Sequence, residues 1–380
     1  MQLLPDWAPN VHPLIIHFPI VLLLIAVVAD LSALLFKKAD WLRKSAVSLY
    51  VLGALGAIVT YFTGKQAADI VTFPPPSYPV ISKHADLALY TTLFFSIYAL
   101  IRLFLFWKKW DTKRWTTGLL FLIAAGGYIL VQQTAEQGGM LVYKYGVGTA
   151  AAKTDSVSSL QAAKVKAPEI VIADNGSWTW PGDDDSFQQF KLVQGQANNL
   201  RIQESANGNA LTINVLSSKP FLLTFGPQLA NVQLVAKVNL DNFKGRFLLV
   251  HHVMNSSRFG FLEIEANQAT LGQVDNDQIR SFDSGKFSPQ GWITLKAVSS
   301  SGHYRGYVND KLIVHGHGSD LPNGTTGIAF SGNGSIQISR IEVVSLDKTP
   351  MMNMKQGHME QGHMEQGNTS HEESGEKHSH

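Results

Sequence analysis

The chain has 380 residues, a formal net charge of +2 and no cysteine. A chain of this length exceeds one ordinary hydrophobic core, so we expect two or more units, and the small net charge favours no nucleic-acid partner. The lack of cysteine excludes disulfides, thiolate metal sites, cysteine nucleophiles, iron–sulfur clusters and covalently attached haem. Any metal must therefore be bound by histidine, methionine, carboxylate or backbone groups.

Four apolar runs in the N-terminal third are each long enough to cross a membrane as a helix, at about 1.5 Å per residue. They cover residues 13–36, 45–63, 85–107 and 116–133. Lysine and arginine gather in the first and third loops between these runs, which the positive-inside rule places in the cytoplasm. The sequence therefore predicts a membrane protein with both termini outside the cytoplasm.

Asp30 is an acidic residue within the first of these spans. A carboxylate at this depth is costly unless it is paired or functional. We expect an ion pair with Lys37, Arg43 or Lys44, because a side chain so close to the membrane edge can reach the interface. A role in proton transfer is the alternative.

Three histidines lie at the predicted outer ends of the helices. His12 and His17 flank the start of the first span, and His84 precedes the third. A short antiparallel bundle brings these ends together, so His17 and His84, with His12 as a further candidate, can ligate haem b or a transition-metal ion through neutral imidazoles. The alternative is that they are interfacial residues that hydrogen-bond neighbouring segments.

Two motifs accompany these histidines. They are His12-Pro13 with His17-Phe18-Pro19, and Gly138-Gly139-Met140-Leu141-Val142-Tyr143 with Gly146-Val147-Gly148. Over about residues 8–150 the chain thereby resembles a bacterial four-helix membrane domain of unknown function. The resemblance implies four spans, an inner-membrane location and a place beside periplasmic redox modules. It implies no activity, so no catalytic residue is assigned, and whether the chain is an enzyme stays open.

The remainder of the chain changes character. Small and polar residues at 149–168 predict a linker, and short β-rich runs separated by Gly, Asn, Asp and Ser at 169–347 predict an antiparallel β-sandwich. Asn309-Asp310 predicts a hairpin turn, and the closing runs resemble concanavalin-like or laminin-G-like jelly rolls. The fold class is therefore α + β multidomain, with a transmembrane bundle at 1–148 followed by a periplasmic sandwich.

Sandwiches of this kind commonly bind glycans. Trp178 and Trp180 can stack on sugar rings, although a core position is the alternative. Glu263 and Glu265 share one strand face at period two, as the acids of a glycosidase do. The flanking positions on that face carry no further acid, so sugar hydrolysis is the least favoured function.

The tail at 348–380 repeats the unit Gln-Gly-His-Met-Glu and has no apolar period, which predicts disorder. Imidazoles suit Cu(II), Ni(II) and Zn(II), whereas thioethers select Cu(I), so we expect copper there. The candidate ligands are His358, Met359, His363, Met364, His371, His378 and His380. A solvated tail without metal is the alternative.

The function expected from these features is redox or metal handling at the periplasmic face, with haem or metal in the bundle, copper in the tail and a periplasmic redox protein as partner. The first alternative is a membrane-anchored module that recognises an envelope glycan or a protein through the sandwich. The second is a membrane enzyme that acts on sugar. The lipid bilayer is a partner in all three.

Overall fold

The computed structural model describes residues 10–36, 40–149, 170–196, 200–204, 210–288 and 290–347. Residues 150–169, which include all but the first residue of the predicted linker at 149–168, and the tail at 348–380 are outside these ranges. The tail ligands expected from the sequence therefore lie outside the described residues, namely His358, Met359, His363, Met364, His371, His378 and His380. Their binding of copper stays a prediction.

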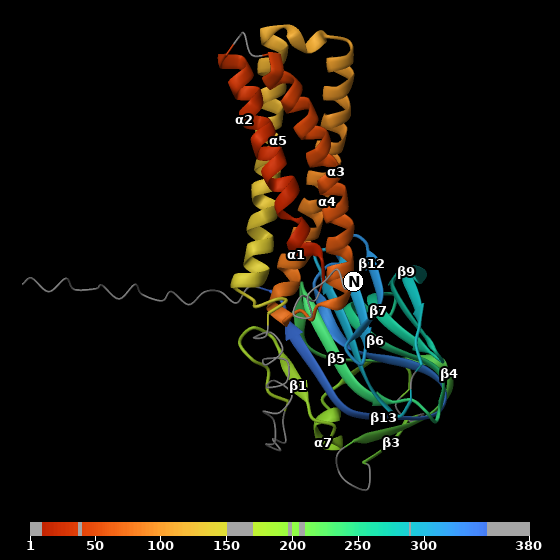
Figure 1. Cartoon of the computed structure of the whole chain (residues 1–380). Coiled ribbons are helices and arrows are strands. Elements are labelled where there is room, and N and C mark those ends of the chain that lie inside the picture. Colours follow the sequence, from red (N-terminus) through yellow and green to blue (C-terminus); the bar gives the residue numbers. More distant parts are fainter. Residues whose placement is uncertain are drawn as a thin grey trace, which may run out of the picture. The chain divides into compact units, whose positions relative to one another are not determined.

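Four long helices occupy the N-terminal part of the chain (Figure 1). They are α2 His17–Leu35, after the short α1 His12–Ile15; α3 Asp40–Ile70; α4 Tyr78–Trp107, after the 3-10 turn η1 Pro75–Ser77; and α5 Arg114–Tyr143, after the 3-10 turn η2 Trp110–Thr112. Each is long and apolar enough to cross a membrane, which confirms the predicted four spans. In α3, α4 and α5 the helical hydrogen bonding continues past the apolar runs into polar residues, so these three helices are longer than the predicted spans.

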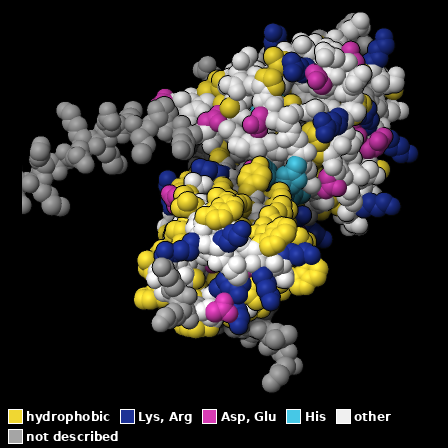
Figure 2. Space-filling view, turned by 90° about the horizontal axis from the view of Figure 1, so that it is seen from above, with side chains coloured by type: hydrophobic (Ala, Val, Ile, Leu, Met, Phe, Trp, Pro, Cys, Tyr) yellow, Lys and Arg dark blue, Asp and Glu magenta, His cyan; other side chains and the backbone are white. Residues whose placement is uncertain are grey.

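Small residues let these helices pack closely. The bundle core contains Leu23, Ala26, Ala46, Tyr50, Ala54, Phe95, Tyr98, Ala99, Leu120 and Ala124. Many large apolar side chains point outward instead, among them Leu24, Leu52 and Leu100. Figure 2 shows such side chains crowded on the helices, whereas the sandwich surface carries scattered acidic and basic groups. An apolar exterior over a small-residue core is what helices surrounded by lipid require.

Among the described residues, two ion pairs join different helical segments. Arg102 Nη2 lies 2.7 Å from Asp30 Oδ1, both groups are buried, and the Tyr50 hydroxyl donates to Asp30 Oδ2 at 2.9 Å. The predicted pairing of Asp30 with a residue of the next loop region is therefore wrong, because Arg102 of α4 reaches the carboxylate inside the bundle. Arg43 pairs instead with Asp111 at 2.8 Å, which ties the start of α3 to the loop between α4 and α5.

The C-terminal part is a large antiparallel sheet that folds back on itself, as predicted for a sandwich. Its strands are β1 Trp178–Trp180, β2 Lys191–Gln194, β3 Leu200–Glu204, β4 Leu211–Leu229, β5 Val232–Asn239, β6 Phe243–Asn255, β7 Arg258–Glu265, β8 Gln268–Asp275, β9 Gln278–Lys286, β10 Trp292–Ser300, β11 His303–Val308, β12 Lys311–His317 and β13 Gly324–Ser345. One short helix, α7 Asp184–Phe187, follows β1.

The strand order is β12-β11-β10-β5-β13-β6-β7-β8-β9, with β4 on β13 and with β2 and β3 on β4. The two ends of this path meet, because β12 lies against β9. Alternating apolar residues of the strands fill the enclosed core, including Phe221, Leu234, Phe247 and Phe330. The sheet thus folds into two layers around this core, and its outward positions are free for polar residues.

Tight turns set the register of the hairpins. Asn309 and Asp310 have φ values of 48° and 62°, as do Asn276 and Asp277 at 50° and 63°. Two successive positive φ values are typical of the type I′ turn, which matches the right-handed twist of the strands. The predicted hairpin turn at 309–310 is confirmed, and this hairpin of β11 and β12 carries the site described next.

Candidate metal centre

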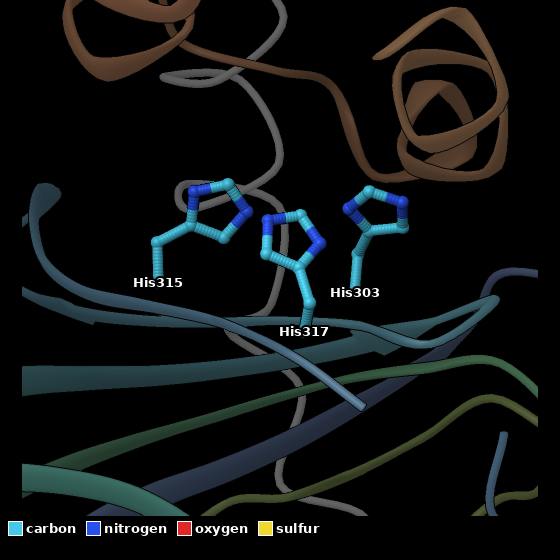
Figure 3. A group of neighbouring side chains, drawn as sticks. All are labelled: His303, His315 and His317. Carbon is cyan, nitrogen blue, oxygen red and sulfur yellow. The ribbon is translucent and has the colours of Figure 1, made fainter. Parts of the chain in front are cut away.

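Three histidines come together on the hairpin of β11 and β12. His303 is paired with His317 across the two strands, and Arg305 is paired with His315. Side chains two residues apart on a strand point to the same face, so all three imidazoles share the outward face. Their candidate ligand atoms lie within 4.8 Å of one another. In Figure 3, His317 lies between His303 and His315, and a ring nitrogen of each flanking residue points toward it.

Burial differs across this triad. The side chain of His303 is 3% exposed, His315 is half-buried and His317 is exposed. Between the last two, Gly316 faces inward, and a Cβ at this position would overlap Phe282. The hairpin therefore packs tightly on the core beneath the histidines, while the site stays accessible from the side of His317.

Hydrogen bonding defines which nitrogen of His303 is free. Its Nε2 lies 3.2 Å from the Oδ1 of Asp86 on α4. An ionised carboxylate can only accept, so Nε2 carries the proton and Nδ1 keeps its lone pair. In the described part of the chain, His303 Nδ1 and His315 Nε2 are buried and have no hydrogen-bond partner. Buried polar atoms are nearly always satisfied, so these two nitrogens require an explanation.

The electrostatics keep the triad neutral. Burial, and next the positive charge of Arg305, lower the pKa of His315 to about 3. The same two causes, in the same order, lower the pKa of His303 and of His317 below the usual 6.5. Neutral imidazole is the form that ligates metal ions. The centre thus presents three neutral nitrogen donors at pH 7.

Helix α4 contributes more than Asp86 to this region. The Tyr78 hydroxyl donates to the Tyr307 hydroxyl at 3.4 Å, and the Arg305 guanidinium carbon lies 5.8 Å from the centre of the Tyr78 ring. Apolar residues of both parts surround these contacts, including Phe73 and Val298. The face of the hairpin that carries the histidines therefore contacts the end of α4 at which that helix begins.

The histidines predicted as bundle ligands occupy different positions. His12 Nδ1 lies 3.2 Å from the carbonyl oxygen of Thr60 on α3, and His84 Nδ1 lies 2.9 Å from that of Thr134 on α5. His17 is exposed on α2. His12 and His84 thus contact different helices, α3 and α5. A haem or metal site in the bundle stays a prediction.

The predicted glycan contacts are wrong. Trp178 is 3% exposed and Trp180 is fully buried, so neither ring face is open to a sugar. Trp178 packs edge-on against Phe225, with ring centres 5.0 Å apart, and Trp180 packs against Phe187 at 5.2 Å. Both indoles belong to the sandwich core, which was the alternative interpretation of this segment.

The sequence analysis did not identify His303, His315 or His317, although a signal was present. His315-Gly316-His317 has the spacing of two same-face residues on a strand, and the Asn309-Asp310 turn brings the preceding strand beside it. Extending the register of that turn without a bulge, however, would place His303 opposite Gly316. The observed register shifts between Gly306 and Tyr307, and this bulge places His303 opposite His317.

Comparisons with known proteins address the two parts separately. Residues 8–151 match the model of a family described as "Predicted membrane protein (DUF2231)". The resemblance seen in the sequence is confirmed for this part. Among curated proteins, none matches the chain.

Three solved structures are similar to less than half of this chain. A carbohydrate-binding module, CBM66, from Bacillus subtilis is 12% identical over 40% of this chain and 94% of its own, with a TM-score of 0.33. A B. subtilis protein of unknown function with a galectin-like fold is 10% identical over 46% and 97%, with a TM-score of 0.36. The Bacillus licheniformis β-glucanase is 9% identical over 46% and 100%, also with a TM-score of 0.36.

Proposed function

We propose that this integral membrane protein binds one transition-metal ion at the three-histidine centre of the β11–β12 hairpin. The observation that carries the proposal is the pair of buried, unpartnered nitrogens, His303 Nδ1 and His315 Nε2, beside a third imidazole. A buried polar atom without a partner costs about 1–3 kcal/mol. A metal ion bound between these nitrogens would satisfy both atoms at once.

The donor set selects the class of ion. Three imidazoles suit Zn²⁺, Cu²⁺ and Ni²⁺, whereas Mg²⁺ and Ca²⁺ prefer oxygen ligands. A carboxylate that accepts from the second nitrogen of a ligating histidine orients the ring and fixes its tautomer, which is the position that Asp86 holds toward His303. Three protein ligands leave a coordination position open to solvent or to a further ligand.

The sequence predicts metal binding in the bundle and in the tail. The site proposed here is in the sandwich instead. The centre would lie in the periplasm if the basic loops are cytoplasmic, because Asp86 and the hairpin are at the helix ends away from those loops. A redox partner, haem in the bundle and copper in the tail stay separate hypotheses. Glycan recognition also stays a separate hypothesis, without Trp178 and Trp180 as contacts because both are buried.

The test uses purified protein in detergent, stripped of metal with a chelator. We expect the chain ending at Asp347 to bind one equivalent of Zn²⁺ or Co²⁺, with a Co²⁺ absorption spectrum of nitrogen-rich coordination. The double variant H315N/H317N should lose at least 100-fold in affinity, because two of three ligands are gone. The matched control is H17N, which changes the exposed bundle histidine and should bind as the unsubstituted chain does.

Two outcomes would contradict the proposal. One is an unchanged stoichiometry and affinity in H315N/H317N. The other is loss of metal in H17N with retention in H315N/H317N, which would move the site to the bundle. The tail is removed in every chain compared, because its histidines and methionines would otherwise bind metal and hide the centre on the hairpin.

A further inference from the structure

Arg305 lies beside the histidine triad on the same strand face. It follows His303 by two residues and is paired with His315 across the hairpin. Its side chain is 3% exposed, and its positive charge acts on all three histidines. The triad therefore has a cationic group as an immediate neighbour, which is unfavourable for a site that binds a metal cation.

The guanidinium is also incompletely paired. In the described part of the chain, Arg305 Nη1 is buried and has no hydrogen-bond partner, and no carboxylate forms an ion pair with it. Its guanidinium carbon lies 5.8 Å from the centre of the Tyr78 ring, and a ring face accepts no conventional hydrogen bond from Nη1. A buried guanidinium is stable only when its donors are satisfied, so an acceptor is missing at this place.

Charge balance gives the sign of the missing group. Neutral imidazoles bring no charge to a divalent ion, so the ion and Arg305 would together place three positive charges in a partly buried region. Asp86 contacts the site but is already bonded to His303 and is half exposed. The carboxylate of Asp69 acts electrostatically on Arg305 and Lys65, but among the described residues it forms no ion pair with either. Lys65 adds a further positive charge that acts on His315 and His317. Like charges at short range repel strongly where water is excluded, unless an anion lies between them.

We propose that the open position of the metal takes a small oxyanion, such as a phosphate, sulfate or carboxylate group, and that Arg305 Nη1 donates a hydrogen bond to it. This inference rests on the proposed metal function. A planar guanidinium suits the oxygens of such groups, and charge-assisted hydrogen bonds to them are short and strong. One anion would complete the metal coordination, satisfy the buried Nη1 and neutralise the excess charge.

The experiment uses the chain ending at Asp347 in detergent, as in the metal-binding test, loaded with Co²⁺ and titrated with inorganic phosphate and, separately, sulfate. The Co²⁺ absorption spectrum reports ligands at the metal. We expect a saturable change with either anion. In R305Q the affinity for the anion should fall at least tenfold, while the Co²⁺ bound by the hairpin stays at one equivalent. The matched control is R280Q, which changes an exposed arginine of β9 and should leave anion affinity unchanged.

Failure of this inference differs from failure of the metal function. A Co²⁺ spectrum that depends on His315 and His317 but does not respond to either anion, or an equal response in R305Q, overturns the oxyanion site alone. Absence of Co²⁺ binding by the hairpin overturns both. If R305Q does not fold, R305K replaces it, because lysine keeps the charge without the planar fork. The expected result is then a several-fold loss of anion affinity, and unaltered affinity contradicts the role of Arg305.

Discussion

At the scale of single residues, the sandwich buries a pair of histidines that is separate from the three on the β11–β12 hairpin. His251 Nδ1 lies 2.8 Å from His252 Nδ1, and His252 Nε2 lies 2.9 Å from the carbonyl oxygen of Ala230. Because a carbonyl only accepts, His252 carries its proton on Nε2, and His251 Nδ1 donates to His252 Nδ1. Burial, and then the neighbouring His252, lower the pKa of His251 well below 6.5. Both rings are therefore neutral in the folded protein.

Acid should destabilise the sandwich through this pair. As the pH falls below 6.5, the unfolded chain binds a proton at His251 whereas the folded chain does not, so the free energy of unfolding falls. For one such histidine the loss between pH 7.5 and pH 5.0 is about 2 kcal/mol. Hydrogen exchange of the β6 amides at both pH values measures this change in the free energy of unfolding.

The variant H251F isolates the contribution of this residue. Phenylalanine has no titratable group and can keep the stacking on Tyr304, whose ring centre lies 6.1 Å from that of His251. The variant should be less stable at pH 7.5, because His252 loses a partner, yet its stability should change less between the two pH values. The histidines of the β11–β12 hairpin also lower the free energy of unfolding at acid pH. They do so equally in H251F and in the unsubstituted chain, so their contribution cancels in the comparison. Equal pH dependence in the two chains would contradict the argument.

At the scale of elements, the contact of α4 with α5 depends on a glycine. A Cβ added at Gly127 of α5 would overlap the ring of Phe94 on α4, whereas one added at Gly126 meets no atom within 4 Å. The Phe94 ring cannot move freely, since it lies 5.1 Å from the Phe95 ring and 6.1 Å from that of Tyr98. Two adjacent glycines thus have opposite structural roles.

The substitution G127A should therefore destabilise the bundle by about 1–3 kcal/mol through overpacking. In G126A the new methyl group enters open space, and the higher helix propensity of alanine should leave the stability unchanged or slightly raised. Thermal unfolding of the full chain in detergent compares the two variants. Equal midpoints would show that the α4–α5 contact is looser than the position of Phe94 indicates.

At the scale of the whole molecule, the contacts at the two ends of the helices support one orientation. Arg43 and Asp111 bring the two basic loops together at one end. Asp86, near the start of α4, contacts His303 of the sandwich at the other end. The sandwich and the basic loops therefore lie at opposite ends of the helices, as the positive-inside rule requires if the sandwich is periplasmic.

Reporter fusions test this orientation. Fusions after residues 40 and 112 should behave as cytoplasmic, and a fusion after residue 160 as periplasmic, because the lysines and arginines of the short loops hold those loops inside. A reporter that is active only in the periplasm and one active only in the cytoplasm should give opposite patterns. A cytoplasmic result at residue 160 would contradict this orientation, because the sandwich and its three-histidine cluster would then lie in the cytoplasm.

The sequence by itself determined the four spans and the β-rich nature of the second part, because both follow from local patterns: long apolar runs, short alternating strands and turn residues such as Asn309-Asp310. The ion-pair partner of Asp30, in contrast, does not follow from any local pattern. It is Arg102, which is 72 residues away along the chain and reaches Asp30 only when α4 packs beside α2.

The three-histidine cluster was likewise decided only by the tertiary structure. His315 and His317 share a strand face by their spacing, but His303 joins them because the register shifts between Gly306 and Tyr307. A shift of one residue reverses which face a side chain occupies, and no local pattern specifies it. Asp86 reaches His303 from α4, 217 residues away along the chain. Spacing along a strand is a property of the sequence, whereas register between strands and contact between distant segments arise only on folding.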